Sequence, residues 1–268
     1  MLQCRQAGAM AGGRALLAGA SADIHAGRFT ALLGPNGAGK STLMSLLSGQ
    51  RQPDAGEVLL DGVALQRHPA QALALRRAVM PQESAVAFDF TVREVAELGR
   101  YPHRRRPSRD EAGIVTRALE ATAVAHLGPR VFNTLSGGEK ARVHLARALA
   151  QVWEPRPDGA ARWLLLDEPT AALDLAHQHH ALRLLRSWAH GQGVGVVAVL
   201  HDLNLALRYA DDVLVLATGA APRFGTTAGV LSAGLIAEVW GVDCHGTSGA
   251  DGVLQYLFGQ ANGAAPEI

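Results

Sequence analysis

One nine-residue segment constrains this chain more than any other part of its sequence. The segment reads Gly34-Pro35-Asn36-Gly37-Ala38-Gly39-Lys40-Ser41-Thr42. It matches the G-x-x-x-x-G-K-[ST] pattern of a phosphate-binding loop, and the alternative is a glycine-rich surface turn. Of the 25 lysine and arginine residues only two are lysine, yet one of the two stands at position 40. A compact ammonium on a flexible stem reaches between phosphates, whereas a planar guanidinium fits a tight loop poorly.

The flanking residues place this loop between a strand and a helix. An apolar run at residues 28–33 leads into the loop, and residues 41–47 follow it with helical spacing. A phosphate-binding loop needs this context, because its backbone N–H groups and the positive end of the helix then face the phosphates.

Further apolar runs predict an α/β fold. Short strands are expected at residues 57–60, 78–80, 163–166 and 194–200. The last two runs are continuously apolar, as in parallel strands that are covered on both faces. Helices are expected at residues 175–190 and 202–209, and a loop at 154–162.

A mostly helical insertion interrupts this core near residues 83–150. Two capping boxes support it, Ser108 with Glu111 and Ser136 with Glu139. From residue 219 onward the periodicity is weak, and the tail beyond Gly259 is expected to fray.

Composition excludes several classes of protein. The net charge of +1 gives no field that would attract nucleic acid, so no nucleic-acid partner is expected. No apolar stretch approaches the length of a membrane span, and the first ten residues carry no secretion signal. Cys4 and Cys244 lack any paired spacing, which indicates unpaired thiols in a reducing compartment.

Two carboxylates end the strand expected at residues 163–166. Asp167 is placed to hold Mg²⁺, with Ser41 supplying a hydroxyl to the same ion. Glu168, one residue on, is placed to polarise a water in line with the γ-phosphorus of a nucleotide. The alternative is an acidic cap on a strand-to-turn junction.

Ser136, Gly137 and Gly138 form a second glycine-rich element. A helix-capping serine followed by two glycines leaves N–H groups and a hydroxyl at a positive helix end, which suits phosphate. One loop already covers the phosphates of one nucleotide, so this element is expected to close over the nucleotide of another copy. The alternative is an ordinary helix start.

Together with Gln82, Asp174 and His201, these motifs stand in the order found in ATP-binding cassette (ABC) ATPases. The chain resembles that family over about residues 14–217, and the resemblance implies ATP and Mg²⁺ as ligands. It implies a single domain over residues 1–268: a RecA-like P-loop core with a mixed or parallel sheet, an inserted helical subdomain and a small antiparallel β part. The boundaries expected are 1–82 and 160–220 for the core, 83–150 for the helical subdomain and 221–268 for a C-terminal extension.

The resemblance also implies roles for single residues. Ser136, Gly137 and Gly138 are expected to touch the γ-phosphate held by a partner subunit, with Asp174 at the seam of the dimer. Gln82 is expected to sense Mg²⁺ and a membrane partner, and His201 to contact the γ-phosphate and the attacking water. The alternatives are a loop glutamine and a polar group at a helix start.

Other segments resemble the ATPase subunit of bacterial hemin importers, within a group that also imports ferric siderophores and cobalamin. These segments are residues 91–95, 99–103, 163–170, 173–178 and 197–206. That resemblance implies a homodimer that drives a transmembrane permease dimer at the cytoplasmic face of the inner membrane. A periplasmic substrate-binding protein is an indirect partner.

Other function classes remain as alternatives. A non-transport ABC ATPase, in translation or DNA maintenance, usually has two cassettes or a long coiled coil, and neither is visible. The Ser136 element argues against a P-loop kinase or GTPase. The chain departs from the family in having no aromatic residue before Phe29, where a ring usually stacks on adenine. The histidines at positions 177, 179 and 180 are expected on a solvated helix surface.

Overall fold

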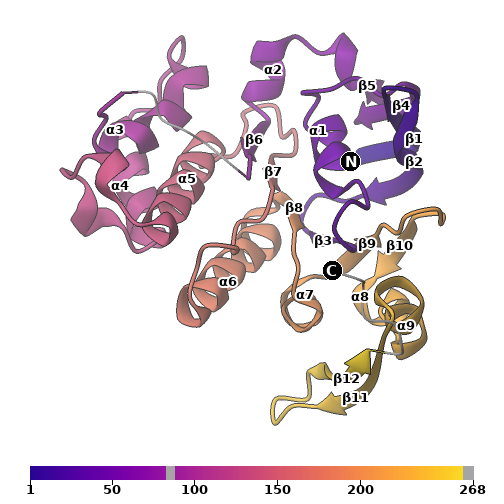
Figure 1. The fold of residues 1–268 in the computed structure, drawn as a ribbon. Coiled ribbons are helices and arrows are strands. Elements are labelled where there is room, and N and C mark those ends of the chain that lie inside the picture. The colour runs from indigo at the N-terminus through magenta and orange to yellow at the C-terminus, as the bar shows by residue number, and fades with distance from the viewer. Residues whose placement is uncertain (83–87, 262–268) are drawn as a thin grey trace.

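A six-stranded sheet forms the centre of the protein in a computed structural model, which describes residues 1–82 and 88–261 (Figure 1). The strand order is β10-β9-β3-β8-β7-β6. Neighbours from β9 to β6 run parallel, and β10 pairs with β9 antiparallel. The strands are β3 (Phe29–Leu33), β6 (Arg77–Met80), β7 (Trp163–Leu166), β8 (Gly195–Val199), β9 (Asp212–Val215) and β10 (Arg223–Thr226).

Both faces of this sheet are covered, which explains the continuous apolar runs. Side chains alternate between the faces of a strand. Leu164 and Leu166 of β7 pack into the larger core cluster, and Leu165 between them packs into a second cluster. The strands expected at residues 163–166 and 194–200 are therefore confirmed to within two residues.

A smaller antiparallel sheet packs over the second cluster. Its strand order is β2-β1-β4-β5. The helix after the phosphate-binding loop, α1 (Lys40–Leu47), lies between the two sheets and buries Leu43 and Leu47 there. The strands are β1 (Leu2–Ala11), β2 (Arg14–Ile24), β4 (Ala55–Leu60) and β5 (Val63–Ala64). The predicted fold class, an α/β core with a small antiparallel part, is confirmed.

Helices gather on the side of the central sheet away from the small sheet (Figure 1). Between β6 and β7 the described chain is helical, and apolar residues of α3, α4 and α5 join the larger core cluster. These elements are α3 (Val92–Glu97), η2 (Leu98–His103), α4 (Glu111–Ala121), η3 (Ala125–Leu127), η4 (Phe132–Thr134) and α5 (Gly137–Gln151).

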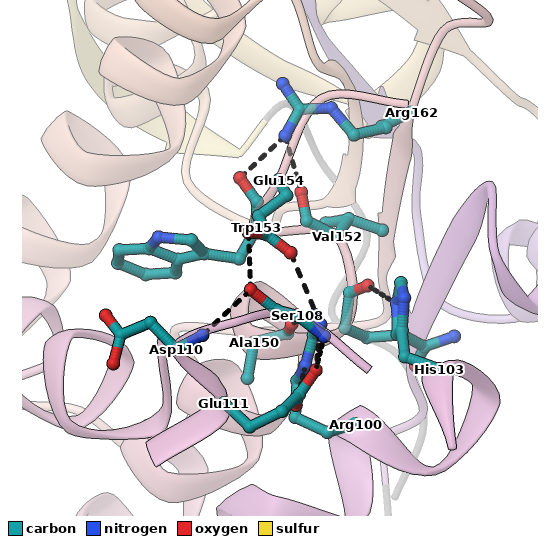
Figure 2. A network of polar contacts seen from close by, with 11 residues as sticks. Arg100, His103, Ser108, Asp110, Glu111, Ala150, Val152, Trp153, Glu154 and Arg162 are labelled. Atoms are coloured by element: carbon teal, nitrogen blue, oxygen red, sulfur yellow. Dashed lines mark hydrogen bonds and ion pairs between the residues drawn. The ribbon is translucent and has the colours of Figure 1, made fainter. Parts of the chain in front are cut away.

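Two buried arginines fasten this helical part to the core at the C-terminal end of α5 (Figure 2). Arg100 pairs with both carboxylate oxygens of Glu111 at 2.7 and 2.9 Å and donates to the Ala150 carbonyl at 2.7 Å. Arg162 donates to the carbonyls of Val152 and Trp153. Carbonyls in the last turn of a helix lack partners within the helix, so the two guanidinium groups satisfy part of that need.

The capping box expected at Ser108 is wrong. Helix α4 begins at Glu111 with Asp110 as its N-cap, and the Asp110 carboxylate accepts from the N–H of Gly113. Glu111 does reach back to the N–H of Ser108, but the Ser108 hydroxyl donates to Glu154 at 2.7 Å. The same hydroxyl accepts from the N–H of Asp110 at 3.3 Å, so it bonds within the turn before α4 and not to the first turn of the helix. The box at Ser136 and Glu139 is confirmed.

The C-terminal extension is more ordered than its weak periodicity suggested. The hairpin of β11 and β12 is held against α7 (Leu203–Tyr209) by Asn204. The side chain of Asn204 forms two hydrogen bonds with the backbone of Tyr256. The remaining elements are η1 (Leu65–Arg67), α2 (Ala70–Ala74), α6 (Leu175–Gln192), α8 (Thr227–Val230), α9 (Ala233–Trp240), β11 (Val242–Ser248) and β12 (Leu254–Ala261).

The tail expected to fray beyond Gly259 lies mostly outside the described residues, although β12 continues to Ala261. None of the helices within residues 1–82 and 88–261 is both long enough and apolar enough to cross a membrane.

Two of the three clustered histidines of α6 are not solvated as expected. His179 Nδ1 lies 2.6 Å from the Tyr209 hydroxyl, and His180 Nε2 lies 2.8 Å from the Ala121 carbonyl. Both rings are half-buried and connect α6 to α7 and to the end of α4.

Candidate active site

Four of the predicted motifs meet at one edge of the central sheet. The phosphate-binding loop follows β3, Gln82 follows β6, Asp167 follows β7, and His201 follows β8. These strands are parallel neighbours in the order β3-β8-β7-β6, so their carboxyl ends lie side by side. Ligands of open α/β sheets bind in the crevice outside the carboxyl ends of the strands.

The phosphate-binding loop lines a hollow of 580 Å³. Gly39 caps α1 with a φ of 94°, and a Cβ there would lie 2.6 Å from the Leu16 carbonyl oxygen, so only glycine fits. Lys40 is 7% exposed and donates to the carbonyls of Gly34 and Pro35 at 2.8 and 2.9 Å. Burial lowers the pKa of its ammonium. Lining residues from the loop are Asn36, Gly37, Gly39, Lys40, Ser41 and Thr42.

Ser41 and Asp167 come together as predicted. The Ser41 hydroxyl hydrogen-bonds to the Asp167 carboxylate, while burial raises the pKa of that carboxyl group. Asp167 Oδ1 has no hydrogen-bond partner among the described residues, although the side chain is only 7% exposed. A buried, unsatisfied carboxylate oxygen beside a hydroxyl suits a hard cation with oxygen ligands, so the donor set fits Mg²⁺.

Glu168 lies between the two single residues that the sequence singled out. Gln82 Nε2 donates to Glu168 Oε2 at 3.1 Å, and His201 Nε2 lies 2.7 Å from Glu168 Oε1. Glu168 also lines the hollow beside Lys40. The carboxylate therefore has a fixed orientation at the rim of the candidate phosphate site.

The backbone of Glu168 is strained. Its φ is 53°, in the left-handed region that residues other than glycine rarely adopt. Such conformations cost about 1–3 kcal/mol and gather at functional sites. This turn carries the chain from the buried Asp167 to Pro169 while the Glu168 side chain faces the hollow.

The Ser136 element lies elsewhere on the surface. Ser136 and Gly137 are exposed, and none of residues 136–138 lines the hollow. Gly138 packs against the turn before α6, because a Cβ there would lie 2.9 Å from the Ala172 carbonyl oxygen. Asp174 caps α6 by accepting from the N–H of His177, and these hydrogen bonds lower its pKa. The structure therefore brings residues 136–138 next to the Ala172–Asp174 turn, and neither segment lines the hollow at the phosphate-binding loop.

Sequence reasoning missed one wall of the hollow. Residues from the tip of the β1–β2 hairpin and from the chain after β9 complete it. Two adjacent glycines, Gly12 and Gly13, were the available signal for that hairpin. The additional lining residues are Ala11, Arg14, Ala15, Leu16 and Thr218.

Comparison with known proteins agrees with this geometry. The family profile described as ABC transporter matches residues 17–171, more than half of the chain. The chain belongs to the ABC transporter family. The cassettes of this family bind nucleotide, in agreement with the phosphate-binding loop and the carboxylates beside it.

Curated relatives and solved structures are similar to this chain over most of its length. The hemin import ATP-binding protein HmuV of Myxococcus xanthus (strain DK1622) is 52% identical over 221 residues, 82% of each chain. The protein of the same name from Escherichia coli O157:H7 is 44% identical over 231 residues, 86% of this chain and 88% of the relative.

Among solved structures, an inward-facing metal-chelate type ABC transporter has a TM-score of 0.78 at 26% identity, over 97% of each chain. A dimeric bacterial ABC transporter cassette has a TM-score of 0.73 at 26% identity, over 85% of this chain and 99% of the other.

Proposed function

We propose that the chain is the ATP-hydrolysing subunit of a bacterial importer for hemin. One observation carries the ATPase part: Glu168, held by Gln82 and His201, faces the hollow that Lys40 lines. The hemin part rests on relatives named as hemin import ATP-binding proteins, which are 44–52% identical over more than four fifths of this chain.

The loop and its lysine bind the triphosphate. Backbone N–H groups of residues 34–42 and the ammonium of Lys40 neutralise phosphate charge where it develops during hydrolysis. Ser41, Asp167 and Gln82 would hold Mg²⁺, and the bound ion would neutralise part of the phosphate charge.

Glu168 accepts the proton of the attacking water. Gln82 and His201 orient its carboxylate, and His201 contacts the γ-phosphate and the water in the assembled site. A general base in a fixed position contributes about 10²- to 10⁴-fold to the rate.

Two copies form the working unit. Ser136, Gly137 and Gly138 close over the γ-phosphate that the partner holds, with Asp174 at the seam. The dimeric arrangement of a cassette with a TM-score of 0.73 to this chain supports this assignment. It accounts for the exposure of the Ser136 element, because the first turn of a helix can bind an anion that another subunit presents.

Closure and reopening of the dimer then move a transmembrane permease dimer. The chain sits at the cytoplasmic face of the inner membrane, and a periplasmic substrate-binding protein delivers hemin to the permease. Gln82 carries the signal between the nucleotide and the permease, because it contacts Glu168 directly.

The decisive experiment reconstitutes the chain with its co-purifying permease in liposomes and measures phosphate release. Hemin with its binding protein is expected to stimulate ATP turnover, and Glu168→Gln is expected to abolish the stimulated rate. Stimulation by a ferric siderophore or cobalamin instead of hemin would keep the ATPase but overturn the substrate. Similarity to a metal-chelate type transporter over 97% of the chain makes this the second candidate. Absence of ATP turnover would overturn the whole proposal.

A further inference from the structure

The hollow at the phosphate-binding loop extends beyond the space that phosphates need. Its far wall is the tip of the β1–β2 hairpin, with Arg14 and Leu16, and Thr218 lies beside it. A smaller hollow of 160 Å³ adjoins and shares Ala15, Leu16, Gly37 and Thr218. Because one hollow runs from the loop to this wall, a nucleotide with its phosphates on the loop can place its base against the wall. None of the described residues that line either hollow is aromatic.

The hairpin holds Arg14 in place. Ala11 pairs with Arg14 across a two-residue turn whose glycines, Gly12 and Gly13, have φ values of 54° and 78°. Positive φ at both central residues is the turn that suits the twist of paired strands. Arg14 is thus the first residue of β2, and its backbone is fixed by the ladder.

An extra residue in β2 turns this part of the strand toward the loop. Leu17 pairs with Ala9 and Ala15 pairs with Met10, so Leu16 is an unpaired bulge residue. Bulges redirect side chains and are common beside active sites. The carbonyl of Leu16 touches Gly39, where a Cβ would lie at 2.6 Å. The hairpin and the phosphate-binding loop are therefore in direct contact and line the same hollow.

The guanidinium of Arg14 is uncommitted. The side chain of Arg14 is exposed and forms no hydrogen bond or ion pair within residues 1–82 and 88–261. By contrast, Arg28 and Arg100 each form two hydrogen bonds to a carboxylate. A charged side chain that lines the hollow and has no protein partner is available to a ligand.

We propose that Arg14 is the base-stacking residue of this chain, its guanidinium lying flat on the nucleobase. The group is planar, delocalised and weakly hydrated, so it stacks on flat π-systems with little desolvation. Proteins that bind nucleic acids stack bases on arginine planes in the same way. Stacking contacts the π-face of a base and not its hydrogen-bonding edges, so adenine and guanine nucleotides bind with similar affinity. This inference rests on the proposed nucleotide-binding function and names the residue that receives the base.

The test compares the binding of Mg²⁺-ADP, Mg²⁺-GDP and Mg²⁺-pyrophosphate to the full chain by titration calorimetry. None of these probes is hydrolysed at the site. Arg14→Ala is expected to weaken the binding of ADP and of GDP about tenfold, in line with the loss of one cation–π contact. Pyrophosphate binding is expected to change by less than about twofold, because an exposed charge contributes little by itself.

Two conservative variants separate stacking from charge. Arg14→Tyr loses the charge but keeps a flat face, so ADP affinity is expected within about threefold of the wild type. Arg14→Lys keeps the charge but loses the plane, so it is expected to resemble Arg14→Ala. Two results would mean that Arg14 acts on phosphate and would overturn the inference. One is an equal loss of affinity for ADP and for pyrophosphate in Arg14→Ala. The other is an ADP affinity that is retained in Arg14→Lys and lost in Arg14→Tyr.

The result also separates this inference from the proposed function. If the wild-type chain binds neither ADP nor pyrophosphate, the nucleotide-binding function itself fails. If the wild type binds ADP and Arg14→Ala binds it equally well, only the role of Arg14 fails.

Discussion

Replacing Glu168 by glutamine tests the chemistry of the proposed site most directly. The amide keeps the volume of the side chain, and its oxygen can still accept from Gln82 Nε2, now at 3.1 Å from Oε2. What is lost is the carboxylate that accepts a proton. Losing a positioned general base slows turnover by about 10²- to 10⁴-fold, or about 2.7–5.4 kcal/mol of activation free energy.

The structure favours a loss within that range over a milder one. Both carboxylate oxygens already have a partner, because His201 Nε2 lies 2.7 Å from Oε1. The base is therefore oriented before nucleotide arrives, and the neighbouring carboxylate of Asp167 is buried and hydrogen-bonded to Ser41. A reduction of about 10³-fold in the rate of ATP hydrolysis is expected, with ATP binding retained.

The assay measures phosphate release at saturating Mg²⁺-ATP and the mass of the complex by light scattering. Glu168→Gln is expected to accumulate as a nucleotide-bound dimer. Glu57→Gln is the matched control, because Glu57 lies on the surface and its ion pair to Arg5 is long, at 3.9 Å. Its turnover is expected within about twofold of the wild type. Turnover of Glu168→Gln above about a tenth of the wild-type rate would refute the assigned role.

Three further changes test other parts of the structure. Lys40→Ala removes the ammonium of the phosphate-binding loop and is expected to weaken ATP about 10- to 100-fold in a binding titration; unchanged affinity would contradict the loop assignment. Gln82→Ala is expected to reduce permease-stimulated turnover more than basal turnover, measured in liposomes and in detergent, and an equal reduction would count against a coupling role. Arg100→Ala breaks the pair with Glu111 and leaves the Ala150 carbonyl without its donor, so unfolding is expected to become easier by about 3 kcal/mol, a melting shift of about 6–12 °C. Hydrogen bonding to Arg100 lowers the pKa of Glu111, so this stabilisation is present at neutral pH and declines as pH falls through that lowered pKa; a melting difference that stays constant into acid would refute the pairing.

The central sheet and the phosphate-binding loop could be predicted because their signals are local. A strand buried on both faces must be apolar at each position, as β7 is from Trp163 to Leu166. The loop has a fixed spacing because its glycines and lysine contact one phosphate chain. Neither signal depends on residues far away in the sequence.

Strands β1 and β2 of the small sheet and the elements of the extension were not located in the sequence, because their signals are weak or distant; the small sheet as a whole was expected only from the family resemblance. Strand β1 buries alanines, such as Ala7 and Ala9, whose small side chains give little contrast between faces. The start of α4 was misplaced at Ser108, whereas Asp110 is the N-cap of that helix. The Ser108 hydroxyl donates to Glu154, 46 residues beyond it. A contact with so distant a residue leaves no local signal in the sequence.

The juxtaposition of Gln82, Glu168 and His201 illustrates how topology supplies what spacing cannot. The first two lie 86 residues apart, and nothing in their separation indicates contact. Yet each follows a parallel strand, and adjacent parallel strands deliver the residues after them to one edge. Reaching that edge is not sufficient for Glu168, because Asp167 just before it must stay buried beside Ser41. A positive φ at Glu168 is what turns its side chain back toward Gln82 and His201, and their contacts offset part of the strain. A glycine at this position would relax the backbone but leave both partners without their acceptor. The strained conformation is therefore best explained by the carboxylate that it presents.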